Sequence, residues 1–238
     1  MKGFGRNNGN ARGWRQIADD VVVMSFPLRA FGIDFRRNVT LLRIADGRVV
    51  IHSTAPFTQK DVAAIRRFGE PAWLLDATLM HNTFAKEGRA TQPNLPYLAP
   101  NGFEKAYGVA AQPLDPPPSA WSGEIDVVKI EGTKKNEHAL FHRRARTLVV
   151  GDLFFSFPSD TRGWPRFFAH HIMRLPTHLF GVSRFFRFMI DDKQAFARSA
   201  NALLQWDFER IVVAHFEPLE TAAKPAAERA LREAGFLK

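Results

Sequence analysis

Two short apolar segments of this chain each lead into a residue that can bind a metal ion, and this pairing constrains the fold more than any other feature. The first reads Leu148-Val149-Val150-Gly151-Asp152, and the second reads Ile211-Val212-Val213-Ala214-His215. Apolar runs of this length, rich in β-branched residues, are typical of buried strands. A carboxylate and an imidazole that follow two buried strands predict the rim of a functional site at one edge of a sheet.

The composition predicts a globular protein with one large domain. The chain has 238 residues, of which 45% are hydrophobic and 24% are charged, as in ordinary globular domains. We expect a flexible tail at residues 1–13 and a single domain at residues 14–238. No apolar run approaches the roughly 18 residues of a membrane span, and the first residues do not resemble a signal peptide.

The chain contains no cysteine. Structural disulfides, thiolate zinc sites and a cysteine nucleophile are therefore all excluded. This composition is compatible with a reducing compartment, and we expect a cytoplasmic protein.

The charge balance predicts an anionic partner. The net charge is +9 and the pI is about 10.2, which favours attraction to nucleic acid, phosphorylated metabolites or an acidic membrane surface. The sequence shows no helix-turn-helix, no stacking-aromatic motif and no basic heptad region. It therefore does not favour nucleic-acid binding, and a small anionic substrate or ligand is the preferred partner.

The chain divides into two halves, each with strands followed by helices. In the first half, alternation and β-branched content predict strands at residues 21–27, 39–44, 48–53, 73–77 and 97–99, a helix from the cap Thr58 to Gly69, and a helical turn at 102–107. Residues 112–119 hold Pro113, Pro116, Pro117 and Pro118, so this segment is predicted to be a connector.

The second half is expected to repeat the same kind of organisation. We predict strands at residues 124–130, 138–142, 147–153 and 210–215, a long helical region at 163–205 that Pro176 breaks into two helices, and a final helix at 222–234. This order of elements indicates an α/β layered sandwich with helices on the outside.

The order of these motifs resembles the metallo-β-lactamase superfamily. The resemblance rests on an opening meander, Asn38-Val39-Thr40-Leu41-Leu42 and Val49-Val50-Ile51-His52-Ser53, followed later by the strand at 147–154 and by Val213-Ala214-His215. It extends over nearly the whole chain from Trp14 onward and is strongest to a divergent branch that lacks the usual dinuclear ligand set. It implies a four-layer αβ/βα sandwich.

The ligand positions of that superfamily are only partly kept. Ordinary members have a His-x-His-x-Asp-His loop after the strand that corresponds to residues 73–77, whereas this chain reads Asp76-Ala77-Thr78-Leu79-Met80-His81-Asn82, with one imidazole. Thr133 and Lys134 stand where the next histidine would fall. Asp152 matches the bridging carboxylate of the superfamily, and His215 matches its final imidazole.

The resemblance therefore implies a degenerate metal site formed by His81, Asp152 and His215, with His52, Asp76 and Asn82 as neighbours. Three such ligands can hold one divalent ion, zinc, iron or manganese, and leave a position for an attacking water. Asp152 and His215 would then be the catalytic residues of a hydrolase that acts on an anionic ester, thioester or phosphoester. The alternative is a non-catalytic binding or interaction protein without metal, in which the two histidines are hydrogen-bonded strand ends and Asp152 caps a loop.

Other charged residues and histidines are expected to have structural roles. His138 and His142 are four residues apart on a predicted strand, which separates them by roughly 13 Å, too far to share one ion. Glu131 and Glu137 flank a lysine-rich turn and are expected to be solvated.

A segment that mixes aromatic and cationic residues follows the Asp152 strand. Residues 164–189 contain Trp164, six phenylalanines and four arginines. Such a mixture can pack on the edge of the sandwich, wall a ligand pocket, contact another subunit of a homo-oligomer, or lie on a membrane surface. For a pocket wall, the candidate substrate-binding residues are Arg166, His170 and Arg174.

Overall fold

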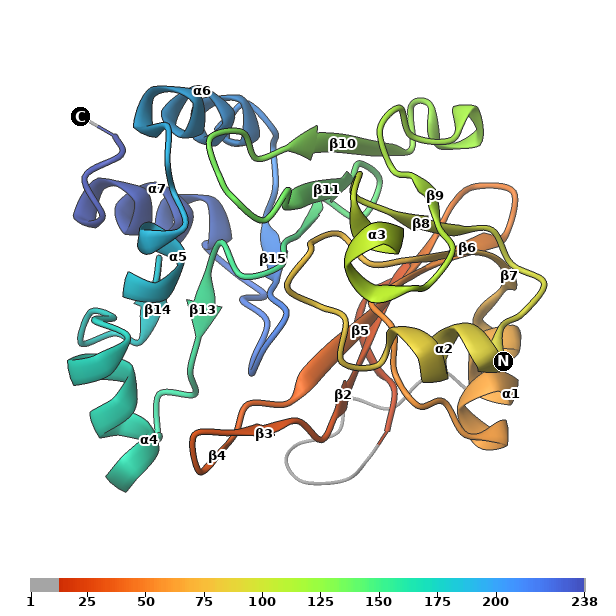
Figure 1. The fold of residues 1–238 in the computed structure, drawn as a ribbon, viewed down its shortest axis with the longest axis horizontal. Coiled ribbons are helices and arrows are strands. Elements are labelled where there is room, and N and C mark those ends of the chain that lie inside the picture. Colours follow the sequence, from red (N-terminus) through yellow and green to blue (C-terminus); the bar gives the residue numbers. More distant parts are fainter. Residues whose placement is uncertain (1–12, 238) are drawn as a thin grey trace.

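The computed structural model describes residues 13–237, and the predicted tail at 1–13 lies outside the described residues except for Gly13. The first half of the chain forms a seven-stranded sheet with the order β1-β2-β5-β6-β7-β8-β9 (Figure 1). Its strands are β1 (Arg15–Ala18), β2 (Val21–Phe26), β5 (Arg37–Arg43), β6 (Arg48–His52), β7 (Glu70–Leu75), β8 (Tyr97–Ala99) and β9 (Gln112–Pro113).

The second half forms a four-stranded sheet with the order β10-β11-β12-β15. Its strands are β10 (Ile125–Lys129), β11 (His138–His142), β12 (Thr147–Val149) and β15 (Arg210–Val212). The two apolar segments that opened the sequence analysis are parallel neighbours here, with Leu148 opposite Ile211 and Val149 opposite Val212. Parallel neighbours end at the same edge of a sheet, so the residues that follow them are brought together.

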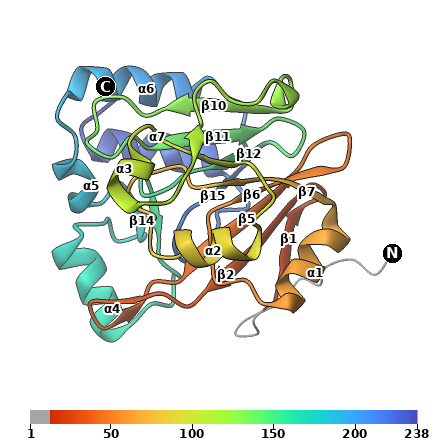
Figure 2. The same ribbon diagram turned by 45° about the vertical axis from the view of Figure 1, so that its right-hand side comes forward.

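Helices cover the outer face of each sheet (Figures 1 and 2). On the first sheet these are α1 (Gln59–Phe68), α2 (Ala85–Thr91) and α3 (Phe103–Tyr107), and on the second they are α6 (Lys193–Leu204) and α7 (Ala223–Glu233). The two sheets pack against each other, so the order of layers is helix, sheet, sheet, helix. The predicted αβ/βα sandwich is confirmed.

Strict alternation along the strands builds this arrangement. In β2, Val22 and Met24 pack on the outer helices, whereas Val21 and Val23 pack between the sheets. Successive side chains of a strand point to opposite faces. A strand with both faces buried therefore needs consecutive apolar residues, and residues 21–24 of β2 read Val-Val-Val-Met.

Helix α1 begins and ends where the sequence predicts. The Thr58 side chain accepts the Asp61 N–H, and the Asp61 carboxylate accepts the Thr58 N–H, which makes a capping box. Helix α1 ends at Gly69. The residue there must be glycine, because a Cβ would lie 2.5 Å from the Gly47 carbonyl oxygen. The close approach of two backbones, and not a left-handed conformation, requires glycine at this position.

The helical region at 163–205 differs from the prediction of two helices. It contains α4 (Gly163–Phe167), a π-helical turn η2 (Phe168–Ile172), the short strand β14 (Phe180–Gly181), α5 (Arg184–Phe188) and α6. Around Pro176 the backbone enters the left-handed region at Arg174 (φ 59°) and Leu179 (φ 61°). The chain thereby turns so that β14 pairs with β13 (Phe155–Ser156), which interrupts the helical run.

Strand β1, helix α2 and a small hairpin were not predicted from the sequence. The hairpin consists of β3 (Arg29–Ala30) and β4 (Ile33–Asp34), and its two turn residues, Phe31 and Gly32, both have positive φ. Such a two-residue turn matches the twist of a hairpin. Glycine makes it recognisable in a sequence, but phenylalanine at the first position conceals it.

Asp152 and His215 do not belong to the strands that precede them. β12 and β15 end at Val149 and Val212, so Asp152 and His215 lie in the loops just beyond the strands. Between residues 13 and 237, no helix has the length and apolarity that a membrane crossing requires.

Candidate metal centre

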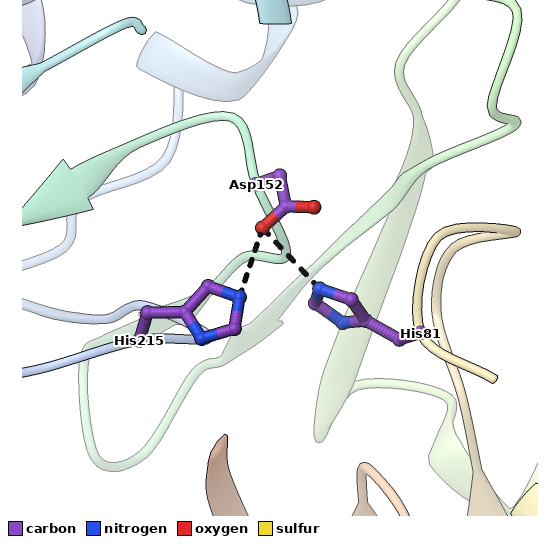
Figure 3. A group of neighbouring side chains, drawn as sticks. All are labelled: His81, Asp152 and His215. Atoms are coloured by element: carbon purple, nitrogen blue, oxygen red, sulfur yellow. Dashed lines mark ion pairs between the residues drawn. The ribbon is translucent and has the colours of Figure 1, made fainter. Parts of the chain in front are cut away.

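Three side chains from distant parts of the sequence meet at one end of the sandwich (Figure 3). His81 Nε2 lies 3.2 Å from Asp152 Oδ1, and His215 Nε2 lies 3.4 Å from the same oxygen. One ligand atom of each residue lies within 4.8 Å of those of the other two. All three side chains are buried. The structure thus brings together the three residues proposed as metal ligands from the sequence.

Each ligand lies in a loop that leaves the end of a strand. His81 follows β7 of the first sheet, whereas Asp152 and His215 follow the parallel pair β12 and β15 of the second. The group therefore spans the two sheets, and its geometry depends on how the two halves of the sandwich pack.

His215 is held in one orientation. Its Nδ1 lies 2.6 Å from the Arg36 carbonyl oxygen, to which it donates a hydrogen bond, and its Nε2 faces Asp152. The ring also stacks on Phe155, with centroids 5.7 Å apart and an interplanar angle of 15°. A hydrogen bond from the second ring nitrogen to a carbonyl is the usual way in which a histidine ligand is oriented.

Asn38 fixes the loop that carries His215. Its side-chain Nδ2 donates to the carbonyl oxygens of Val213 (2.8 Å) and Phe216 (2.9 Å), and its backbone N–H donates to Ala214 (2.8 Å). The side-chain oxygen accepts a hydrogen bond from Ser25 Oγ at 2.5 Å. Asn38 is buried at the start of β5. The first sheet therefore determines the position of a ligand that belongs to the second.

Glu137 holds the loop that carries Asp152, and the expectation that it is solvated was wrong. It is 1% exposed, and its carboxylate accepts the backbone N–H groups of Gly151 (3.1 Å), Asp152 (2.9 Å) and Leu153 (3.1 Å). Burial, together with the nearby charge of Asp152, raises the pKa of Glu137 to about 8, although the three N–H donors oppose this shift. A side chain with two acceptor oxygens is suited to this position because the loop presents three N–H donors.

Burial and neighbouring charges set the protonation states of the centre. Burial, reinforced by the positive charge of Arg37, lowers the pKa of His81 to about 4. Burial raises the pKa of Asp152, but the contacts with His81 and His215 outweigh this and hold it well below its usual value. At neutral pH, His81 is therefore a neutral imidazole and Asp152 an ionised carboxylate, and these are the forms that bind metal ions.

Two ligand atoms that lack hydrogen-bond partners among the described residues also indicate a metal site. His81 Nε2 and Asp152 Oδ1 are both buried, and neither has a hydrogen-bond partner among the described residues, because their contact lacks hydrogen-bond geometry. Buried polar atoms without partners are costly. A divalent ion between the three side chains would satisfy both atoms.

A buried arginine lies beside the centre. Arg37 is 3% exposed, its Nη1 donates to Ser53 Oγ at 3.3 Å, and its Nε has no hydrogen-bond partner among the described residues. Burial lowers the pKa of the guanidinium, while the negative charges of Asp76 and Asp152 raise it. Arg37 thus places a fixed positive charge next to two carboxylates. Nothing in the sequence pattern distinguished it from a surface arginine at a strand end.

His52 and Asp76, proposed as neighbours, are both buried near Arg37. Burial lowers the pKa of His52 to about 3, and the nearby His81 and Arg37 contribute further to this shift. Neither ring nitrogen of His52 has a hydrogen-bond partner within the described part of the chain. Asp76 accepts hydrogen bonds from the backbone and hydroxyl of Thr54 and from Tyr97. Neither residue belongs to the three-ligand group.

The centre forms part of the wall of a pocket of about 430 Å³. Apart from the three ligands, Arg37 and two small polar residues, the wall is apolar, with contributions from Leu28, Phe31, Phe35, Met80, Phe155, Met173, Phe185 and Met189 among others. The pocket therefore combines an apolar chamber with one metal centre and one guanidinium. Pockets of this size and lining suit small organic ligands.

The predicted substrate-binding residues do not line this pocket. Arg166 lies on α4 and donates to the Thr161 carbonyl at 3.5 Å, His170 lies in η2 with Nδ1 3.2 Å from the Leu175 carbonyl, and Arg174 is exposed. Arg37, which the sequence analysis did not single out, is the cation that reaches the pocket wall.

His138 and His142 lie on β11, as expected, and neither joins the metal group. Both are buried and have backbone partners: His138 Nδ1 lies 3.0 Å from the Asn136 carbonyl, and His142 Nε2 lies 2.9 Å from that of Arg43. Their role is structural, as the sequence analysis expected.

Comparison with known proteins identifies the fold. No family model matches the chain, and no curated protein matches its sequence. Solved structures that match include the DIM-1 metallo-β-lactamase (TM-score 0.62, 14% identity, 93% of this chain and 97% of that one) and metallo-β-lactamases from Erythrobacter litoralis (0.64, 14%, 94% and 96%) and Pontibacter korlensis (0.59, 10%, 92% and 98%). The chain has the metallo-β-lactamase fold.

Proposed function

We propose that the protein is a hydrolase that uses a single divalent metal ion held by His81, Asp152 and His215. The observation that carries the proposal is the convergence of two imidazoles and a carboxylate, with unpartnered ligand atoms, in the wall of an apolar pocket. Two imidazoles and one carboxylate suit zinc, iron or manganese. Such an ion polarises a water molecule and lowers its pKa toward neutrality.

The position of Arg37 favours one bound metal ion over two. A second cation in this fold would need further ligands near His81, but the sequence supplies one imidazole in that loop. The guanidinium interacts with Asp76 and Asp152, so it already compensates the buried negative charge. A second metal ion placed near it would be repelled at short range, where the low dielectric strengthens like-charge repulsion.

The pocket wall supports an anionic substrate with an apolar portion. Arg37 is the one lysine or arginine in the wall formed by the described residues. A guanidinium binds carboxylate or phosphate groups in a fixed geometry, and its unpartnered Nε shows that its donors are not all used by the protein. The apolar side chains around it would hold an acyl or aromatic group. An ester, thioester or phosphoester that carries a negative charge has both parts.

The roles of the chain's own residues follow from this arrangement. Arg36 orients the His215 ring through its carbonyl, and Glu137 and Asn38 hold the ligand loops in place. Asp152 is ionised at neutral pH, so it can bind the metal and accept a hydrogen bond from the attacking water. Arg37 would bind the negative charge of the substrate and orient the scissile bond toward the centre.

Metal analysis of the purified protein tests the proposal. We expect close to one zinc, iron or manganese per chain, lost in His215→Ala but retained in His178→Ala, which removes a surface histidine paired with Glu233. A panel of chromogenic esters, thioesters and phosphoesters should then show hydrolysis that a chelator abolishes. Metal-free wild-type protein with the same stability as His215→Ala would contradict the proposal and favour a non-catalytic binding protein of the same fold.

A further inference from the structure

The exposed apolar side chains of the molecule gather on one surface. Among residues 13–237, the large hydrophobic side chains that are exposed are Phe31 (68%), Trp164 (47%), Phe167 (50%), Phe185 (38%) and Phe188 (66%). They come from the β3–β4 turn, α4 and α5, and Figure 1 shows the hairpin and α4 side by side at the lower left. We call these five residues the aromatic surface. A gathered, exposed apolar patch marks an interaction site more often than scattered apolar residues do.

The aromatic surface is a fixed structure. Trp164 Nε1 donates to the Phe31 carbonyl at 2.8 Å, which ties α4 to the hairpin turn. The buried ring of Phe168 contacts Phe31, Trp164 and Phe185, with ring centroids 5.4, 5.9 and 6.2 Å apart. Three of the five exposed rings therefore pack on one buried ring, and Phe167 stacks on Trp164 with ring centroids 5.7 Å apart.

The segment that carries α4 and α5 also carries five arginines without acidic partners. Arg162, Arg166, Arg174, Arg184 and Arg187 lie in the same segment, and residues 161–190 contain no aspartate or glutamate. None of the five forms an ion pair within the described part of the chain, whereas Arg43, Arg144 and Arg146 elsewhere all do. Arg184 lies over the Phe188 ring at 5.1 Å. Residues 161–190 thus carry a positive charge that no acidic side chain of the same segment compensates.

We propose that the aromatic surface docks on an anionic lipid bilayer. Tryptophan and phenylalanine insert into the boundary between headgroups and acyl chains, and arginines around them attract anionic headgroups. A protein partner or a second copy of this chain would need acidic side chains opposite five arginines. The surface of this chain is itself positive here, so self-association through this face would bring like charges together.

The aromatic surface adjoins the pocket that contains the metal centre. Phe31 and Phe185 belong both to the aromatic surface and to the pocket wall. Docking would therefore hold the pocket close to the headgroups. The proposed docking does not depend on the metal centre, because none of the five aromatic side chains is a ligand.

Vesicle flotation tests this proposal with the full-length protein. Phosphatidylcholine vesicles with about one third phosphatidylglycerol should carry the protein at low salt, and pure phosphatidylcholine vesicles should carry much less. Raising the salt to about 0.5 M should weaken the binding, since the electrostatic attraction is screened over a few ångströms. Absence of flotation with anionic vesicles at low salt would overturn the proposal.

Variants locate the binding surface. Phe167→Ala/Phe188→Ala and Arg184→Gln/Arg187→Gln should each lower the affinity for anionic vesicles, the second pair by about 25-fold if each arginine contributes about fivefold. Arg66→Gln/Arg67→Gln, two exposed arginines on α1 at the far side of the molecule in Figure 1, should lower it much less. His215→Ala should float like the wild type, which separates docking from the metal proposal. An equal loss in the α1 pair, or a dimer in solution that the aromatic variants dissociate, would refute membrane docking through this surface.

Discussion

Replacing Asn38 by alanine should weaken metal binding, although Asn38 touches no ligand. Its side chain donates to the carbonyls of Val213 and Phe216, on either side of His215. Each lost hydrogen bond in a buried site costs about 1–1.5 kcal/mol. Asn38→Ala should therefore destabilise the fold by about 2–3 kcal/mol, which corresponds to a fall in Tm of about 5–10 °C for a chain of this size.

The effect on the metal should exceed a general loss of stability. The freed loop no longer presents His215 Nε2 toward Asp152, and loss of such an indirect support typically lowers metal affinity by about 10–100-fold. Urea denaturation measures the stability, and competition with a fluorescent chelator measures the affinity.

Ser25→Ala provides the matched control, because it removes only the hydrogen bond to the Asn38 oxygen. It should leave the metal affinity within about threefold of the wild type. If Asn38→Ala binds metal as tightly as Ser25→Ala while losing the expected stability, Asn38 does not position His215 for metal binding.

Two further predictions concern buried charged or titratable groups. His52 has a pKa of about 3 in the folded protein; the unfolded chain takes up its proton below about pH 6.5, so stability is lost as the pH falls from 6.5 toward 3, by about 1.4 kcal/mol per pH unit. In His52→Leu, urea denaturation at pH 7.5 and pH 5 should therefore show a smaller difference than in the wild type, and an unchanged difference would contradict the assignment. Glu137→Ala leaves three buried N–H groups without an acceptor and should cost about 3 kcal/mol or more, whereas the exposed Glu131→Ala should change stability by less than about 0.5 kcal/mol; equal costs would show that Glu137 does not hold the loop.

The layered fold could be predicted because it depends on local patterns. The parallel pair β12 and β15 appears in the sequence as two apolar runs, and the start and end of α1 follow from Thr58 and Gly69. The three ligands could also be predicted from the sequence, since each follows a predicted buried strand or matches a position of the superfamily that the chain resembles. These features require only the residue and its near neighbours.

The supports of the site could not be predicted, because they depend on contacts between distant segments. Glu137 lies next to a lysine-rich turn in the sequence, which is typical of a solvated residue, yet the fold buries it against the Asp152 loop. Asn38 reaches a loop about 175 positions away. The aromatic region after Gly163 was predicted as two helices, because helical periodicity does not reveal that β14 pairs with β13.

A crystal structure with anomalous diffraction measured at the metal absorption edge would show whether the three side chains hold one metal ion. We expect one anomalous peak per chain at roughly 2.0–2.2 Å from Nε2 of His81, Nε2 of His215 and a carboxylate oxygen of Asp152. Two peaks near these residues, or a metal-loaded crystal whose only peak lies elsewhere, would contradict it.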